Sequence, residues 1–419
     1  MSHVNYDFLS ESILFGKDLE NNFASIDENV LKRAIRGYRE YVLSHKNEII
    51  LETLGDRKKV SVTIESFGHY PEEELLKQLA LYIDSVFIAD PVFELTPERR
   101  EMDDVMSVYM GMKEKDVLDK DKLAEALKYM KKNTSLVVCN FVKFVPITLL
   151  HEVSEYVPIR FDKDNFNNCL PSEILSFLRK HIVVHNLEPC PDGLRVLFEE
   201  PLKKGTGLYI FFPECKERSG EVVRYMQMNH TTICDESGKM VVELEIPDSI
   251  SDMEFRIWLH QSINAASKQL YDETYKELCY AQELHSMYMT RSQFKADLLT
   301  KGITNNSVQS KIANLVLELD IPVFQNISLD NIMEIRQNYG ESFKNFRSEL
   351  GNKLIHLNGI EDDRQLMAEL DAVSYEINET YINSINREIS SLKRSLGMEI
   401  AILTGTLLSS YATGGMTLV

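Results

Sequence analysis

The sequence predicts an α+β protein with a mixed α/β N-terminal region, an antiparallel β-meander in the middle and a long helical bundle at the C-terminus. Helical and extended patterns alternate over the first 190 residues, short apolar runs separated by turns fill 193–247, and helical periodicity dominates from Ser251 onward. We therefore expect a mixed α/β domain (1–190), an antiparallel β segment packed on it (191–250), a helical bundle (251–396) and an apolar tail (397–419).

The N-terminal region alternates between the two periodicities. Apolar residues at helical spacing, and a proline followed by three glutamates, predict helices over 28–52, from Pro71 onward, and over 119–132. Extended runs predict strands over 59–64, 85–89 and 135–147. This alternation is typical of a sheet covered by helices.

The middle region consists of five short apolar runs, which begin with GLRVLFEE and end with KMVVELEIP. The turn segments KKGTG, ERSG and ESG lie between runs. Turn residues at this spacing are typical of hairpins, so we expect antiparallel strands here.

The C-terminal region contains two apolar series at helical spacing. The first runs from Ile332 to Leu354 and the second from Leu366 to Leu396, where eight steps cover 30 residues. That mean step of about 3.75 residues exceeds the 3.5-residue repeat of a left-handed coiled coil. The two series therefore predict a long antiparallel hairpin within a bundle and argue against a parallel dimeric zipper.

Composition excludes a disordered chain and argues against nucleic-acid binding. Of the 419 residues, 44% are hydrophobic and 26% charged, and the formal net charge is −19. Phosphate recognition needs a basic surface, whereas the densest basic cluster (32–39 and 57–59) is interleaved with acidic residues. We interpret that cluster as a solvated helix face.

The cysteines and the N-terminus indicate a cytoplasmic protein. Six cysteines are scattered without a CxxC pair, which is typical of reduced thiols. Residues 1–9 lack the basic and apolar parts of a signal peptide.

His181 and His185 form a candidate metal site. Four-residue spacing on a helix that starts after Pro171 would place both imidazoles on one face, and His151 and Cys190 could add ligands. The glutamate of HExxH is missing, and Ile-Val-Val between the histidines is typical of a core segment. We favour a structural role and predict no cofactor.

Asp192, Glu214 and Lys216 loosely fit the PD-(D/E)xK pattern of metal-dependent nucleases. In that chemistry the two carboxylates hold a divalent cation and the lysine orients the attacking water. Pro213 lies directly before Glu214, where the pattern requires a strand interior. Because the motif is short and degenerate, a metal-dependent hydrolase or nuclease is only the alternative function.

Two other segments have both a binding and a structural interpretation. Residues 298–315 have the outline of a helix-turn-helix, but a corner between two bundle helices explains the same residues. Arg336 and Arg347 could form a cationic pocket, but an interhelical ion pair with a residue such as Asp371 or Glu379 is the favoured interpretation.

Residues 400–419 carry no charge and follow Lys393 and Arg394. About 20 apolar residues are needed to cross a bilayer, so the length is just sufficient. Four threonines, two serines and three glycines favour instead a buried helix or a segment docked on a partner or a second subunit. Membrane contact through this tail is the less favoured alternative.

The sequence therefore predicts a non-enzymatic interaction protein, as an oligomer or as a subunit of a larger complex. The support is an amphipathic hairpin and an uncovered apolar end, with no firm catalytic motif. A role in bacterial antiviral defence is a further hypothesis that rests only on how common such systems are, and no residue of the sequence supports it. The expected contact residues are Tyr339, Phe343, Phe346, Ile402, Leu407 and Leu408.

Overall fold

The computed structural model of the chain divides into two compact units. It describes residues 3–54, 59–64, 70–95, 118–146, 169–191, 193–215, 220–233, 240–290, 292, 294–295, 297–298, 319–325, 327–360, 362–396, 401–406 and 417–418. Unit 1 comprises residues 1–97, 117–154 and 275–419, and unit 2 comprises 98–116 and 155–274. The four domain boundaries expected from the sequence stay a prediction.

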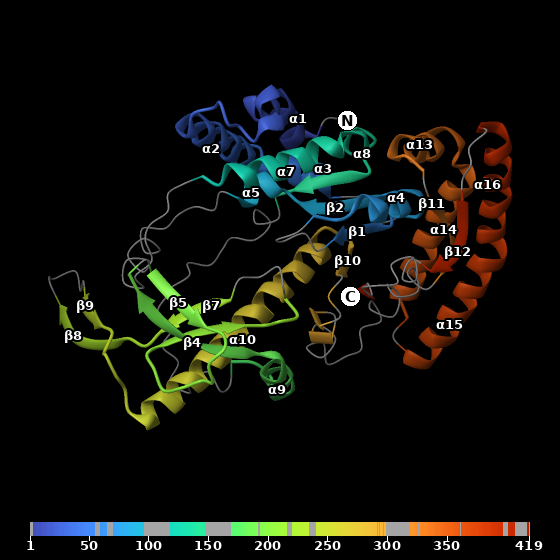
Figure 1. Cartoon of the computed structure of the whole chain (residues 1–419). Coiled ribbons are helices and arrows are strands. Elements are labelled where there is room, and N and C mark those ends of the chain that lie inside the picture. The colour runs from blue at the N-terminus through green and yellow to red at the C-terminus, as the bar shows by residue number, and fades with distance from the viewer. Residues whose placement is uncertain are drawn as a thin grey trace. The chain divides into compact units, whose positions relative to one another are not determined.

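Unit 1 is built on a mostly parallel sheet (Figure 1). The described strands lie in the order β13 (Thr417–Leu418), β10 (Met287–Thr290), β1 (Ser61–Ile64), β2 (Ser85–Ala89) and β3 (Val142–Val145). β10, β1, β2 and β3 run parallel, and β13 pairs antiparallel with β10. Parallel strands need crossover helices, which explains why the N-terminal region alternates between helix and strand.

Two of the crossover helices lie where helical periodicity predicted them, from Pro71 onward and over 119–132. α4 (Glu73–Tyr82) connects β1 to β2, and α5 (Pro91–Glu94), α7 (Lys120–Lys132) and α8 (Thr134–Val138) precede β3. The strand predicted at 85–89 is confirmed residue for residue. In the apolar run 135–147 only Val142–Val145 is a strand, because Thr134–Val138 forms α8 instead.

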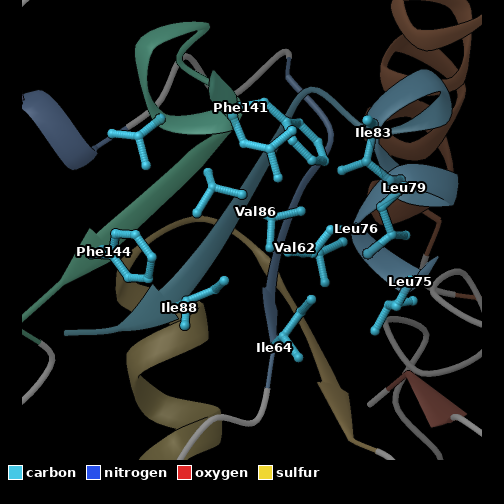
Figure 2. Close-up of a cluster of buried hydrophobic side chains, with 14 of the residues drawn as sticks. Val62, Ile64, Leu75, Leu76, Leu79, Ile83, Val86, Ile88, Phe141 and Phe144 are labelled. Atoms are coloured by element: carbon cyan, nitrogen blue, oxygen red, sulfur yellow. The ribbon is translucent and has the colours of Figure 1, made fainter. Parts of the chain in front are cut away.

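The core of unit 1 lies on the face of the sheet that α4 covers. Figure 2 shows the side chains of β1, β2 and α4 gathered there with two phenylalanines, and the labelled residues are Val62, Ile64, Leu75, Leu76, Leu79, Ile83, Val86, Ile88, Phe141 and Phe144. Successive strand residues point to opposite faces. Phe87, Ala89 and Val145 therefore face the other way, against Tyr280 of α10 (Asp252–Glu283) and Leu284, which directly follows it.

The N-terminal helices precede the sheet in the chain. They are α1 (Val4–Glu11), the 3₁₀ turns η1 (Ile13–Phe15) and η2 (Lys17–Asn21), α2 (Glu28–Ser44) and α3 (Lys46–Thr53). α2 begins at Asp27, whose side chain accepts from the Asn29 amide. The single helix predicted over 28–52 is thus divided at His45.

The two C-terminal apolar series form helices as predicted. The first comprises α13 (Leu329–Glu334), the π turn η4 (Ile335–Tyr339) and α14 (Glu341–Asn358), and the second comprises α15 (Asp363–Glu376), the π turn η5 (Ile377–Ile382) and α16 (Asn383–Leu396). A four-residue step overshoots an α-helical turn by about 0.4 residue. Four such steps run from Val373 to Ile389, and η5 lies within them, so the wider π turn absorbs the drift. Val373, Ile377, Ile385 and Ile389 are buried, and Tyr381 is half-buried.

The prediction of helix from Ser251 to the end was too simple. β10, β11 (Asp320–Gln325) and β12 (Ala401–Thr406) interrupt it, and β11 pairs antiparallel with β12. The expected buried helix of the tail is wrong for 401–406, because these residues supply a strand. Within the described ranges, no helix has the length and apolar character needed to span a bilayer.

Unit 2 contains the antiparallel strands expected from the middle region. One sheet has the order β5 (Gly193–Leu197), β4 (Val183–Cys190), β6 (Gly207–Phe211) and β7 (Glu221–Arg224), and a separate ribbon pairs β8 (Gln227–Ile233) with β9 (Met240–Glu245). Helix α9 (Ser172–His181) leads into β4. The fold class is therefore confirmed as α+β, with a mixed α/β N-terminal region, antiparallel strands in the middle and a helical bundle at the C-terminus.

Leu79→Ala should lower the free energy of unfolding by about 2–5 kcal/mol, because it opens a cavity in the core of unit 1. Leu51→Ala is the matched control, since Leu51 is 71% exposed and its loss should stay within about 0.5 kcal/mol. Urea denaturation of both variants measures the difference. Equal losses would contradict the packing described here.

Candidate functional site

The candidate site is an aromatic face on the antiparallel sheet of unit 2. Residues directly opposite each other in a sheet point to the same side, and His185 of β4 lies opposite Tyr209 of β6, as Val183 lies opposite Phe211. Phe198 directly follows β5. We call His185, Phe198, Tyr209 and Phe211 the aromatic face.

The four rings are in mutual contact. The His185 ring centroid lies 5.2 Å from that of Phe198, edge to face, and 5.7 Å from that of Phe211, nearly parallel to it. Tyr209 lies 5.6 Å from Phe211 and 6.1 Å from Phe198. Aromatic pairs prefer these offset and edge-on arrangements, so the rings hold one another in place.

The opposite face of the same sheet is used for packing within unit 2. Leu208 and Ile210 lie there against Ile250, Trp258 and Ala266. The aromatic face carries the alternate residues of the strands, and Phe198 is 60% exposed while the other three rings are half-buried. An exposed cluster of rings on a sheet whose other face is packed is typical of an interaction surface.

Gly220 fixes one side of the aromatic face. Its amide donates to the Tyr209 hydroxyl at 3.0 Å, and a Cβ at this position would overlap the Tyr209 ring. The tyrosine is therefore held by a contact that only glycine allows, so the surface is formed before any partner arrives.

The structure corrects the placement of the two histidines. α9 ends at His181 and His185 lies within β4, so they do not share a helix face. His181 Nδ1 lies 2.7 Å from Glu214 Oε1. Among the residues with a described position, no three His, Cys, Asp or Glu side chains gather as a metal site.

The nuclease constellation falls mostly outside the described residues. Asp192 and Lys216 are not described, whereas Glu214 is described and pairs with His181. The constellation thus stays a prediction.

Most of the helix-turn-helix outline (298–315) is also not described. In the basic cluster, Lys32 and Glu28 form an ion pair at 2.9 Å, as expected for a solvated helix face.

Arg336 and Arg347 do not meet the partners expected for them. Arg347 Nε lies 3.2 Å from Asp84 Oδ1, and its Nη1 donates to the Leu81 carbonyl at 2.6 Å. The expected partners were Asp371 and Glu379 on the neighbouring helix; the partner is instead the α4–β2 connection. The predicted ion pair thus forms for Arg347, with Asp84 in place of an acid on the neighbouring helix, whereas Arg336 contacts backbone carbonyls.

Arg336 contacts the same segment with both terminal nitrogens of its guanidinium group. It donates to the carbonyls of Ala80, Ile83 and Asp84, and it lies 4.9 Å from the centroid of the Phe141 ring. Burial, and secondarily Arg347, lowers the pKa of Arg336 to about 10, so it remains charged at neutral pH. We call Arg336, Arg347 and residues 80–84, which comprise the end of α4 and its connection to β2, the arginine corner.

The expected contact residues lie in several places. The Phe343 and Phe346 rings are buried against Tyr82, each 5.6 Å from it between centroids. Tyr339 is the last residue of the π turn η4. Ile402 of β12 lies opposite Phe324 of β11, and Leu407 and Leu408 are outside the described residues. Their role as contacts with a partner stays a prediction.

The aromatic face was missed from the sequence. Its signal is the alternation of Tyr209 and Phe211 in one strand, with His185 in another. Period-two alternation predicts which residues share a face. It does not tell which face the rest of the chain covers, so the exposed rings could be found only from the structure.

Arg336→Met should lower the free energy of unfolding by about 3–5 kcal/mol, because three buried carbonyls lose a charged donor. Arg336→Lys should restore only part of this loss, since an ammonium cannot reproduce the planar fork. Denaturant titration at pH 7 compares the variants. If Arg336→Lys unfolded with the same free energy as the wild type, the planar donor arrangement of the guanidinium group would not be what stabilises this corner.

A comparison with protein-family models, with curated proteins and with solved structures finds no match to this chain.

Proposed function

We propose that this chain is a non-enzymatic interaction protein, a subunit of a larger complex, and that the aromatic face binds its partner. The observation that carries the proposal is the cluster of the exposed Phe198 ring with three half-buried rings, on a sheet whose opposite face is packed. Aromatic side chains are enriched at the centres of protein interfaces, where they bury a large area at a small entropic cost.

Charge favours a basic protein partner over a second copy of the chain. Each chain carries a formal charge of −19, so two copies repel one another at long range. A partner with an apolar centre and a basic rim is instead attracted, and its association should weaken as salt increases. The proposal therefore commits to a partner of net positive charge.

The proposal also includes a cytoplasmic location. Three of the described cysteines, Cys139, Cys190 and Cys279, are free thiols, which supports a reducing compartment. A role in bacterial antiviral defence remains a separate hypothesis, since no residue of the aromatic face bears on it.

Phe198→Ser tests the proposal. The variant should fold normally because Phe198 is 60% exposed. Val138→Ser is the matched control, because Val138 is an apolar residue of unit 1 that is 72% exposed. Proteins captured from native cells by the full-length chain are identified and purified, and each is titrated against wild type and both variants by calorimetry.

The expected result is one basic partner whose affinity falls at least about 30-fold with Phe198→Ser, as for a central interface residue, and is unchanged with Val138→Ser. Its affinity for the wild type should fall as salt is raised. Equal affinity of Phe198→Ser and wild type would overturn the proposal. So would a wild-type dimer in native mass measurements that Phe198→Ser alone converts to monomer.

A further inference from the structure

Helix α1 covers the outer edge of the parallel sheet in unit 1. Among the described strands β3 is terminal, and its outward edge would otherwise present unpaired backbone groups. Asn5 Nδ2 donates to the Phe144 carbonyl at 2.8 Å, which occupies one of these groups. The same amide donates to Asp90 Oδ2 at 2.9 Å, so one buried side chain links α1 to the edge of β3 and to the residue that follows β2. The Tyr6 ring of α1 also stacks on Phe144, at 6.2 Å between centroids.

Glu52 of α3 holds the beginning of α1. Its Oε2 accepts from the Val4 amide at 3.2 Å, where a carboxylate also suits the positive end of the helix. Lys143 of β3 donates to the Glu52 carbonyl at 2.7 Å. A helix end, a carboxylate and an ammonium group therefore meet at one corner.

His3 lies buried in this corner and cannot accommodate a second proton well. It is only 7% exposed, and its Nε2 has no hydrogen-bond partner within the described part of the protein. Its Nδ1 lies 3.5 Å from Glu52 Oε1, too far for a good hydrogen bond. An imidazolium carries a positive charge as well as a second N–H, and burial of the ring disfavours that charge.

The charges around His3 come from each element packed against it. Glu52 of α3 and Asp7 of α1 favour the protonated ring, as does the backbone of Val137 in α8, whereas Lys143 of β3 opposes it. Burial outweighs these contributions and lowers the pKa of His3 below its usual value of 6.5. The docked helix thus prefers neutral His3.

We propose that α1 is an acid-sensitive latch, in which protonation of His3 releases the helix and uncovers the edge of β3. The sign follows from linkage: the docked state binds fewer protons than the released state, so docking is fully stable above pH 6.5 and weakens as pH falls below it. An uncovered strand edge is a template for pairing with another strand.

Asp90, the other buried titratable group fastened to α1, acts in the opposite direction. Burial raises its pKa above 3.8, although Tyr38, Asn5 and two backbone amides donate to it. A raised carboxyl pKa contributes stability that is lost as pH rises. A loss of docking on acidification therefore points to His3 and not to Asp90.

Hydrogen exchange of the full chain at pH 7.5, 6.5 and 5.5, corrected for intrinsic rates, tests the latch. The opening constant of α1 should rise below pH 6.5 by up to about tenfold per pH unit, the limit for one linked proton. Residues 142–145 should lose protection together with α1. Protection of α14 should not change, which provides an internal control.

Two variants test whether His3 causes the pH dependence of α1 protection. His3→Gln keeps a polar side chain without a titration near neutral pH, so the protection of α1 should become independent of pH. Lys143→Met removes the opposing charge, so the pH response should weaken. Equal wild-type protection at the three pH values would overturn the latch, as would an unchanged response in Lys143→Met or a full response in His3→Gln.

Discussion

Unit 1 depends on how the carbonyls at the end of α4 are satisfied. The last four carbonyls of any helix lack a partner within the helix, and a buried carbonyl without a donor costs about 1–3 kcal/mol. At this corner Arg336 and Arg347 reach the carbonyls of residues 80 and 81 in the last turn of α4, and those of residues 83 and 84 just beyond it, from more than 250 positions away in sequence. The C-terminal helices thereby complete an end of α4 that the N-terminal half leaves unsatisfied.

The contact between the C-terminal helices and the end of α4 also places the C-terminal aromatic residues in the core of unit 1. Tyr82, the last residue of α4, donates to the Pro322 carbonyl at 2.5 Å and packs edge-on against Phe343 and Phe346. These rings close the core of unit 1, and α1 covers its sheet edge. Unit 2 differs, because one face of its antiparallel sheet is packed while the aromatic face carries the exposed Phe198. We therefore place the proposed binding activity in unit 2 and the proposed acid response in unit 1.

Local patterns predicted the elements well and their partners poorly. Alternation and helical spacing depend on neighbouring residues, so β2 and the buried faces of α14 and α16 were visible in the sequence. Pairing at a distance leaves no such local mark, so Asp84 was missed as the partner of Arg347, as was the pairing of 401–406 with β11. The histidine spacing misled because the helix ends at His181, one residue before the extended backbone of Ile182.

A double-mutant cycle between Asp84 and Arg347 tests the central role of the arginine corner most directly. The free energy of unfolding is measured at pH 7 for wild type, Asp84→Ala, Arg347→Met and the double variant. A buried ion pair in direct contact should show a coupling of about 1–3 kcal/mol, with each single variant losing most of what the double variant loses. Losses that add within about 0.3–0.5 kcal/mol would mean that the two side chains act independently and would contradict the account.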